Sequence, residues 1–235
     1  MIKLKNLLEL NKMTYNSGPA GRHKKRMMTP LTLFENEYAL PNQLPPENSS
    51  QTTLDEVKYL QCLEVDKPYV EKYDKVKQSF KEVFEELGLP YMKEELKSLL
   101  KESGKFITEL KYKYNRPRPK QIAEFYGFDF DDVDLGSMKT PSYPSGHAVQ
   151  GYLAGKYYAN KYPEHSETFE QLGEDIAHSR IIGKAHYPSD KHFGKTVAEY
   201  LFTLLKKWKF YISICIVSIS MRFSMEQRQL NTETS

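Results

Sequence analysis

The sequence predicts an all-α fold. Apolar residues recur every three or four positions from about Thr53 to Trp208, which is the period of helices that bury one face. Glycine and proline residues interrupt this pattern at intervals and mark helix ends. With 39% hydrophobic and 13% aromatic residues among 235, the chain can bury a sizeable core. We therefore expect a single helical domain over residues 51–208.

The segments on either side of this domain lack a helical pattern. Residues 1–50 contain scattered Gly, Pro, Asn and Ser, so we expect them to be irregular and partly disordered. The basic run Arg22 to Arg26 lies within them, and such a run is more typical of a solvated tail than of a binding patch. The apolar run at the N-terminus is short and is broken by Glu9, which does not fit a secretory signal and favours a cytoplasmic location.

Residues 209–235 form a tail of different character. The apolar run from Phe210 to Ile219 is too short to cross a bilayer, which needs about 20 residues. The pattern leaves open whether this tail is a packed terminal segment, a membrane-surface anchor or a stretch without defined structure.

Three amphipathic helices are expected in the first half of the domain. The first begins near Thr53, the second covers about residues 70–84 and ends before Gly88 and Pro90, and the third runs from about Met92 to Tyr114. Their apolar stripes contain, in order, Leu54, Val57, Leu60 and Leu63; Val70, Tyr73, Val76, Phe80, Val83 and Phe84; and Leu96, Leu99, Leu100, Ile107 and Leu110.

Two cations stand near the end of the third helix. Lys111 follows Ile107 by one helical turn and lies at the margin of the buried face, where a lone lysine ordinarily reaches back to water. The prolines around Arg118 end the helix and leave this arginine on a stiff, extended corner, seven residues after Lys111. Arg116, in the same stretch, receives no role. A short helix near residues 120–125 and a solvated acidic loop follow.

The loop from Lys139 to His147 leads into another helix. Ser145 and Gly146 stand at its start, where backbone amides lack partners within the helix and suit phosphate oxygens. Taken alone, Ser145 fits an ordinary N-cap better than a phosphate ligand, and His147 fits a surface position on the helix. The apolar residues of this helix are Val149, Tyr152, Leu153, Tyr157 and Tyr158.

The stretch from Ser179 to Asp190 carries the remaining polar residues of interest. A helix over roughly residues 166–183 places Arg180 on its apolar face, where the charge needs an anionic partner, either a carboxylate of the protein or a phosphate. His186 and Asp190 follow, four residues apart, and Pro188 starts the next helix. This spacing fits a metal half-site, a core hydrogen bond or a histidine held in one tautomer by a carboxylate. The last helix, from about residue 189 to 208, is expected to be core.

Charge and cysteine content exclude several classes. A net charge of +3 gives no strong indication of a nucleic-acid partner. Cys62 and Cys215 lie far apart without metal-binding spacing, so neither a disulfide framework nor a zinc site is predicted.

Three blocks in this order resemble the signature of the type 2 phosphatidic acid phosphatase superfamily, which includes non-specific acid phosphatases and vanadium haloperoxidases. They are Lys111 with Arg118-Pro119, Pro144-Ser145-Gly146-His147, and Ser179-Arg180 with His186 and Asp190. The resemblance implies a helical bundle with the phosphate site at its centre. It also implies His186 as nucleophile, Asp190 as its orienting partner, His147 as general acid, and phosphate-binding roles for Lys111, Arg118, Arg180, Ser145 and Gly146.

These residue types suit phosphoryl transfer without a metal ion or another cofactor. Fixed cations and amides can stabilise the charge on the equatorial oxygens. A neutral His186 can attack phosphorus to give a phosphohistidine, while Asp190 stabilises the imidazolium and His147 protonates the leaving group. Vanadate, which takes the shape of the transition state, is expected to inhibit.

The expected substrate is a small, water-soluble phosphomonoester. A mean hydropathy of −0.66 and the absence of a run of 18 apolar residues distinguish the chain from membrane-threading members. The alternatives left open are a vanadate-dependent haloperoxidase, a lipid phosphate phosphatase, a non-catalytic phosphate-binding or structural protein, and a metalloprotein that uses His186, Asp190 and His192. The oligomeric state is not predicted.

Overall fold

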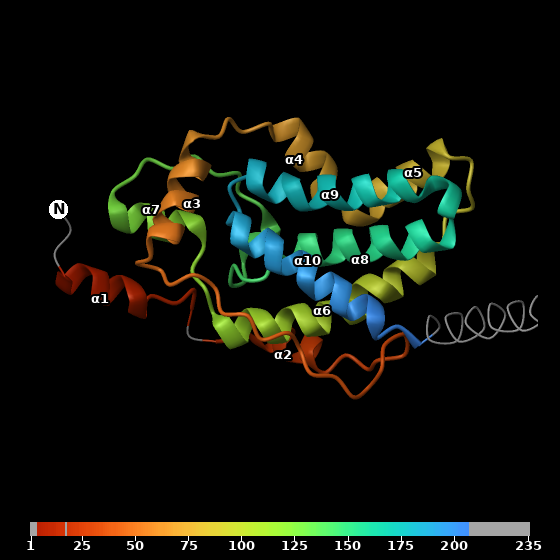
Figure 1. The fold of residues 1–235 in the computed structure, drawn as a ribbon, viewed down its shortest axis with the longest axis horizontal. Coiled ribbons are helices and arrows are strands. Elements are labelled where there is room, and N and C mark those ends of the chain that lie inside the picture. Colours follow the sequence, from red (N-terminus) through yellow and green to blue (C-terminus); the bar gives the residue numbers. More distant parts are fainter. Residues whose placement is uncertain (1–3, 17, 207–235) are drawn as a thin grey trace, which may run out of the picture.

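The computed structural model describes residues 4–16 and 18–206. Within these ranges the regular secondary structure is helical, with no β-strand, which confirms the all-α prediction. Four helices make the centre of the fold (Figure 1). These are α6 (Lys93–Tyr114), α8 (Gly146–Lys161), α9 (Ser166–Ile182) and α10 (Pro188–Thr203). Their apolar faces contribute most of the main hydrophobic core, as the sequence pattern predicts.

The antiparallel pair α8 and α9 packs closely because glycines face each other along the seam. A Cβ atom placed on Gly155 of α8 would lie 2.6 Å from the carbonyl oxygen of Phe169 on α9. That distance is far inside van der Waals contact, so only glycine permits the observed separation of the two helices. Such close packing gives the site at the ends of these helices a rigid base.

Helices α3 (Gln51–Cys62), α4 (Lys67–Asp74), α5 (Val76–Glu86) and α7 (Pro119–Tyr126) surround this centre. The prediction of one helix over about residues 70–84 is wrong, because the structure ends α4 at Asp74 and starts α5 at Val76. Lys75 between them has φ −97° and ψ 65°, which is not helical. The break frees the backbone carbonyl of Asp74, which is 3.1 Å from Nε2 of His147.

The N-terminal segment is more ordered than the sequence suggests. It contains α1 (Leu4–Lys12) and α2 (Gly21–Met27), and it buries Leu10 and Phe34 completely. The expectation of an irregular segment is therefore wrong for these two helices. Leu10 packs α1 into a hydrophobic cluster with residues of α3 and α7, and α2 contacts α6. The division of the chain at residues 50 and 208 stays a prediction.

The last helix ends earlier than predicted. α10 stops at Thr203, and the backbone beyond it bonds to the N-terminal segment instead: Glu35 N donates to Leu204 O (2.9 Å) and Lys206 N donates to Leu33 O (2.9 Å). The tail 209–235, with its apolar run, lies outside the described residues. Across the part of the chain that the structure describes, no helix combines the length and apolar character needed to cross a membrane.

Candidate active site

Four helix ends meet at the left of the central helices in Figure 1, and they carry the predicted site residues. The last turns of α6 and α9 supply Lys111 and Arg180, while α8 and α10 begin at the same end. Helix N-termini carry partial positive charge, so α8 and α10 add to the field of the two cations. The arrangement is therefore suited to an anion.

His186 and Asp190 form a buried pair. Nδ1 of His186 lies 3.0 Å from Oδ2 of Asp190, and the same oxygen accepts the backbone N–H of Tyr187 at 3.1 Å. Because the ionised carboxylate accepts a hydrogen bond from Nδ1–H, the neutral imidazole carries its lone pair on Nε2. Burial, followed by the nearby Arg118 charge, lowers the pKa of His186 well below its ordinary value, so the ring is neutral.

Arg116, which received no role from the sequence, is buried and holds the other side of this pair. Its Nη1 donates to Oδ1 of Asp190 at 2.7 Å, and its Nη2 lies 3.3 Å from Glu56. Burial alone would raise the pKa of Asp190, but the Arg116 charge and hydrogen bonds from His186 and Ser142 outweigh it and hold that pKa below its usual range. Asp190 is therefore ionised at every working pH.

Lys111 and Arg118 are buried cations that no carboxylate in the described residues meets at ion-pair distance. Lys111 donates instead to the carbonyl oxygens of Pro141 and Ser142. Burial, then their mutual repulsion, lowers the pKa of Lys111, and burial lowers that of Arg118 to about 10. Desolvated positive charge of this kind favours an anionic ligand.

Arg118 occupies the extended corner that the sequence predicts, at φ −74° and ψ 156°. Its guanidinium donates to the carbonyl oxygens of Thr140 (2.9 Å) and Ala185 (2.8 Å). Nη1 also lies 2.9 Å from Nε2 of His186, the atom that bears the lone pair. The candidate phosphate ligand and the candidate nucleophile are thus direct neighbours.

Arg180 and His147 share one acidic partner, Asp74. Arg180 Nη1 donates to Oδ1 of Asp74 at 2.8 Å, and His147 Nε2 lies 3.1 Å from the Asp74 backbone oxygen and 3.4 Å from the carboxylate. Burial and the charge of Arg180 lower the pKa of His147 to about 3. Sequence reasoning missed Asp74 because the residue lies in a continuous helical pattern and carries no motif.

Ser145 and Gly146 begin α8 beside Lys111. The Ser145 hydroxyl accepts the N–H of Ala148 at 3.3 Å as an N-cap, and its own hydrogen can still be donated to a ligand. A Cβ on Gly146 would lie 3.4 Å from Ile107 and 3.7 Å from Lys111, which are ordinary contact distances, so this residue lies directly against α6. The first amides of α8 therefore lie next to the cations.

The structure does not bring the three residues of the metal hypothesis together, because His192 is exposed on α10 while His186 and Asp190 are buried. Among the residues described, no group of three or more His, Cys, Asp or Glu side chains is arranged to hold a metal ion.

Comparison with known proteins gives a consistent result. Residues 100–214, which include all the predicted site residues, match the family model described as PAP2 superfamily. A non-specific acid phosphatase of Salmonella typhimurium is 31% identical over 112 residues, which cover 47% of this chain and 44% of that protein. An acid phosphatase of Zymomonas mobilis subsp. mobilis is 31% identical over 112 residues and is covered to 42%. The similarity thus spans less than half the length of these relatives.

Proposed function

We propose that this chain, whose residues 100–214 match the PAP2 superfamily model, is a member of that superfamily and a phosphatase that hydrolyses phosphomonoesters through a phosphohistidine. One observation carries the proposal. Two buried cations without a carboxylate partner in the described structure, Lys111 and Arg118, lie beside a buried histidine whose Nε2 is free of its proton. The acid phosphatase relatives support the same class of reaction.

Binding of the phosphate group is the first step. The group's oxygens replace the backbone carbonyls that Lys111 and Arg118 meet, and Arg180 and the amides of Ser145 and Gly146 complete the set. Nη1 of Arg118 donates to the Nε2 lone pair of His186 at 2.9 Å, and a charged phosphate oxygen is a stronger acceptor than neutral imidazole, so this contact opens in favour of the anion. Nε2 of His186 then faces phosphorus.

The chemical step follows from this geometry. The Nε2 lone pair of His186 attacks phosphorus in line, and the bond between phosphorus and the ester oxygen breaks as protonated His147 gives its proton to that oxygen. Asp190 stabilises the imidazolium while the equatorial oxygens stay on the cations. Water then attacks phosphorus with loss of its proton to His147, and the N–P bond breaks to release phosphate and restore neutral His186.

His147 becomes an acid only in the substrate complex. Burial and Arg180 lower its pKa to about 3, whereas a bound phosphate brings two negative charges among the same cations and raises that pKa. His147 therefore takes up the proton that the leaving oxygen needs when the substrate binds. Small water-soluble phosphomonoesters are the substrates we propose, and no metal or other cofactor is required.

Turnover of para-nitrophenyl phosphate by the purified protein tests the function. We expect hydrolysis that a chelator does not reduce, loss of hydrolysis in His186→Ala, and retention of phosphate binding in that variant. His192→Ala is the matched control, because His192 is an exposed histidine on the same helix, and it should keep full activity. Activity that persists in His186→Ala, or that requires an added divalent ion, would contradict the mechanism.

A further inference from the structure

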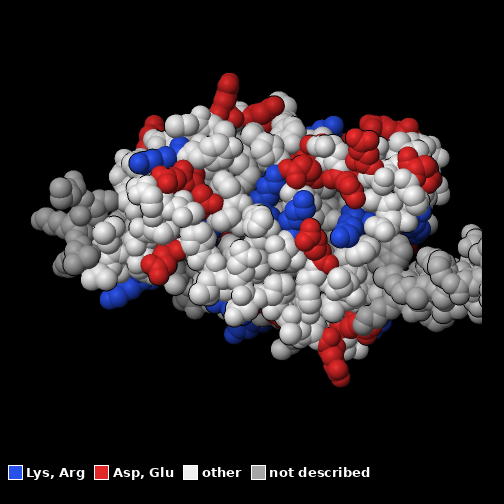
Figure 2. Space-filling view, viewed as in Figure 1, with Lys and Arg blue, Asp and Glu red and all other residues white. Residues whose placement is uncertain are grey.

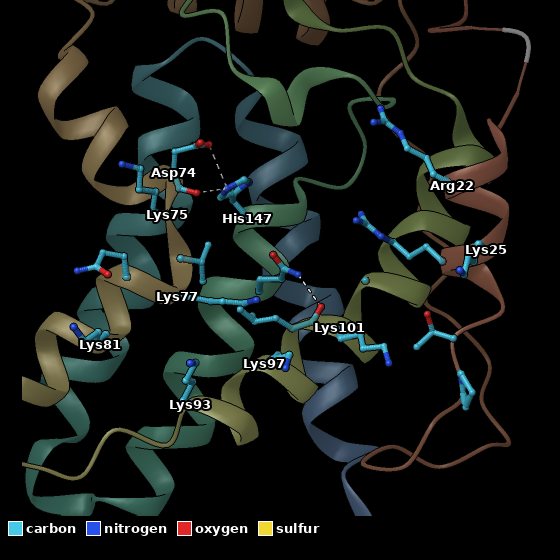
Figure 3. Close-up of a pocket in the computed structure, with 18 of the residues that line it drawn as sticks. Arg22, Lys25, Asp74, Lys75, Lys77, Lys81, Lys93, Lys97, Lys101 and His147 are labelled. Carbon is cyan, nitrogen blue, oxygen red and sulfur yellow. Dashed lines mark hydrogen bonds and ion pairs between the residues drawn. The ribbon is translucent and has the colours of Figure 1, made fainter.

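We propose that the site acts on the end of a phosphate chain, of the inorganic polyphosphate type, which lies in a basic groove that begins at His147. The inference rests on the proposed phosphatase function and extends its substrates from phosphomonoesters to phosphoanhydrides. The groove has a volume of about 1300 Å³ and is walled by α2, α5 and α6 (Figure 3). Nine lysines and arginines line it, against a single carboxylate, Asp74, which Arg180 already neutralises.

A row of lysines follows the length of the groove. Lys93, Lys97 and Lys101 are spaced four residues apart on α6, so they rise about 6 Å from one to the next along one face. Lys77 faces them from α5 in Figure 3. Lys97 is paired with Glu94 at 3.0 Å, but no carboxylate of the described chain lies at ion-pair distance from Lys77, Lys93 or Lys101. Such unpaired charges attract a polyanion.

The basic run near the N-terminus forms another part of the wall. Arg22 and Lys25 of α2 line the groove in Figure 3, while His23 between them is buried and contacts the hydroxyl of Tyr112 on α6. The run is therefore anchored to the fold. By contrast, the face in Figure 2, over α9 and α10, carries acidic side chains intermingled with basic ones.

The side chains of the groove favour a chain of phosphates over a nucleic acid. Proteins that bind single strands combine basic grooves with aromatic rings on which bases stack. Tyr91 is the one Phe, Tyr or Trp among the lining residues, and its ring packs against Phe84 with centroids 5.8 Å apart while its hydroxyl donates to Lys77 O at 3.2 Å. The groove thus offers positive charge but no exposed aromatic ring on which a base could stack. This suits a ligand that carries a charge on every unit and has no bases.

The position of His147 places the leaving group in the groove. His147 and Asp74 line its upper end in Figure 3, and Lys77 and Lys97 lie beyond them. Attack of His186 on the terminal phosphorus breaks its bond to the bridging oxygen, and water then releases phosphate. In the overall reaction, a chain of n phosphates and one water molecule give a chain of n − 1 phosphates and one free phosphate. A phosphate leaving group is less basic than an alkoxide, so it depends less on protonation by His147.

Steady-state kinetics with tripolyphosphate and with para-nitrophenyl phosphate test the groove. In Lys77→Gln/Lys101→Gln we expect the KM for tripolyphosphate to rise by about three- to tenfold, and more than the KM for para-nitrophenyl phosphate. The matched control Lys12→Gln/Lys58→Gln removes two exposed lysines of α1 and α3 that do not line the groove, and it should change neither KM. Added salt should weaken tripolyphosphate turnover more in the wild-type protein than in the groove variant.

Several outcomes overturn the inference. The first is an enzyme that hydrolyses para-nitrophenyl phosphate but not tripolyphosphate. The second is an equal change of KM in the groove and control variants. The third is a 5′-phosphorylated oligonucleotide that competes more strongly than tripolyphosphate. Calorimetry of tripolyphosphate binding to His186→Ala separates the two proposals. If His186→Ala binds tripolyphosphate and the groove substitutions weaken that binding, the groove proposal is supported even if the catalytic mechanism fails. If His186→Ala does not bind tripolyphosphate, only the groove proposal is contradicted.

Discussion

Two arginines that are two residues apart hold the buried pair of His186 and Asp190 from opposite sides. Arg118 contacts Nε2 of His186, while Arg116 donates to Oδ1 of Asp190 and meets Glu56. The spacing to Lys111 singles out Arg118 in the sequence. No local pattern reveals Arg116, because its partners Glu56 and Asp190 lie far away in the chain and only the fold brings them together.

This difference predicts that two similar substitutions lower the free energy of unfolding by very different amounts. Arg116→Met leaves two carboxylates buried without their partner, so we expect a loss of about 3–5 kcal/mol in the free energy of unfolding. Arg118→Met removes a buried cation that has carbonyl partners and no carboxylate, so it should cost much less while abolishing phosphate binding. Urea unfolding of both variants measures the contrast, and equal losses would contradict the assigned partners.

The two histidines predict the pH dependence of turnover. The pKa of His186 lies well below 6.5, so the nucleophile stays neutral in acid and activity persists below that pH. The pKa of His147 is about 3 without phosphate and rises in the complex, so kcat should fall as the pH increases through the raised value. The profile of kcat against pH with an alkyl phosphate measures this, and His147→Ala should remove the fall at high pH.

The same variant has a leaving-group signature. Acid catalysis contributes about 10²- to 10⁴-fold, but only where the leaving oxygen is basic. His147→Ala should therefore slow an alkyl phosphate far more than para-nitrophenyl phosphate, whose phenolate leaves without a proton. Equal loss with both substrates would mean that His147 has a structural role.

The sequence pattern predicts that a helix is present more reliably than it predicts the residues at which the helix begins and ends. The period of apolar residues identifies α6 and α9 nearly to the residue and the presence of α8, because each buries one continuous stripe. It misses the break at Lys75, since Val70, Tyr73, Val76 and Phe80 continue the stripe on both sides. That break is required by the contacts of Asp74 with His147 and Arg180, which are tertiary and leave no local trace.

The seam between α8 and α9 gives a prediction for stability. Gly155→Ala puts a methyl group 2.6 Å from the Phe169 carbonyl, so the helices must separate, and we expect a loss of about 1–3 kcal/mol. Gly21→Ala is the control, because a Cβ there meets nothing within 4 Å and its backbone φ is not positive. Thermal unfolding should show a lower Tm for Gly155→Ala alone, and an unchanged Tm would mean that the helices pack less closely than described.

At the scale of the molecule, the fold concentrates positive charge at one end of the central helices and continues it along the groove. The motif residues converge because four helices end at the same place, which their antiparallel order requires. The sequence could not place the N-terminal segment, since the contacts of Leu10, His23 and Phe34 with the domain are single and widely spaced. For that reason the sequence predicts that the basic run is solvated, whereas in the structure it lines the basic groove.

The concentrated charge predicts that anions stabilise the whole protein. A ligand that binds only the folded state at about 100 times its Kd adds about 2.7 kcal/mol, which in a domain of this size raises the Tm by about 5–10 °C. Vanadate should reach this shift at a lower concentration than phosphate, because it takes the shape of the transition state. Lys111→Met should fold without loss of Tm, since it removes a buried cation without a carboxylate partner in the described structure, yet it should lose most of the shift. Scanning calorimetry with each anion measures both effects, and an undiminished shift in Lys111→Met would place the anion outside this cluster of helix ends.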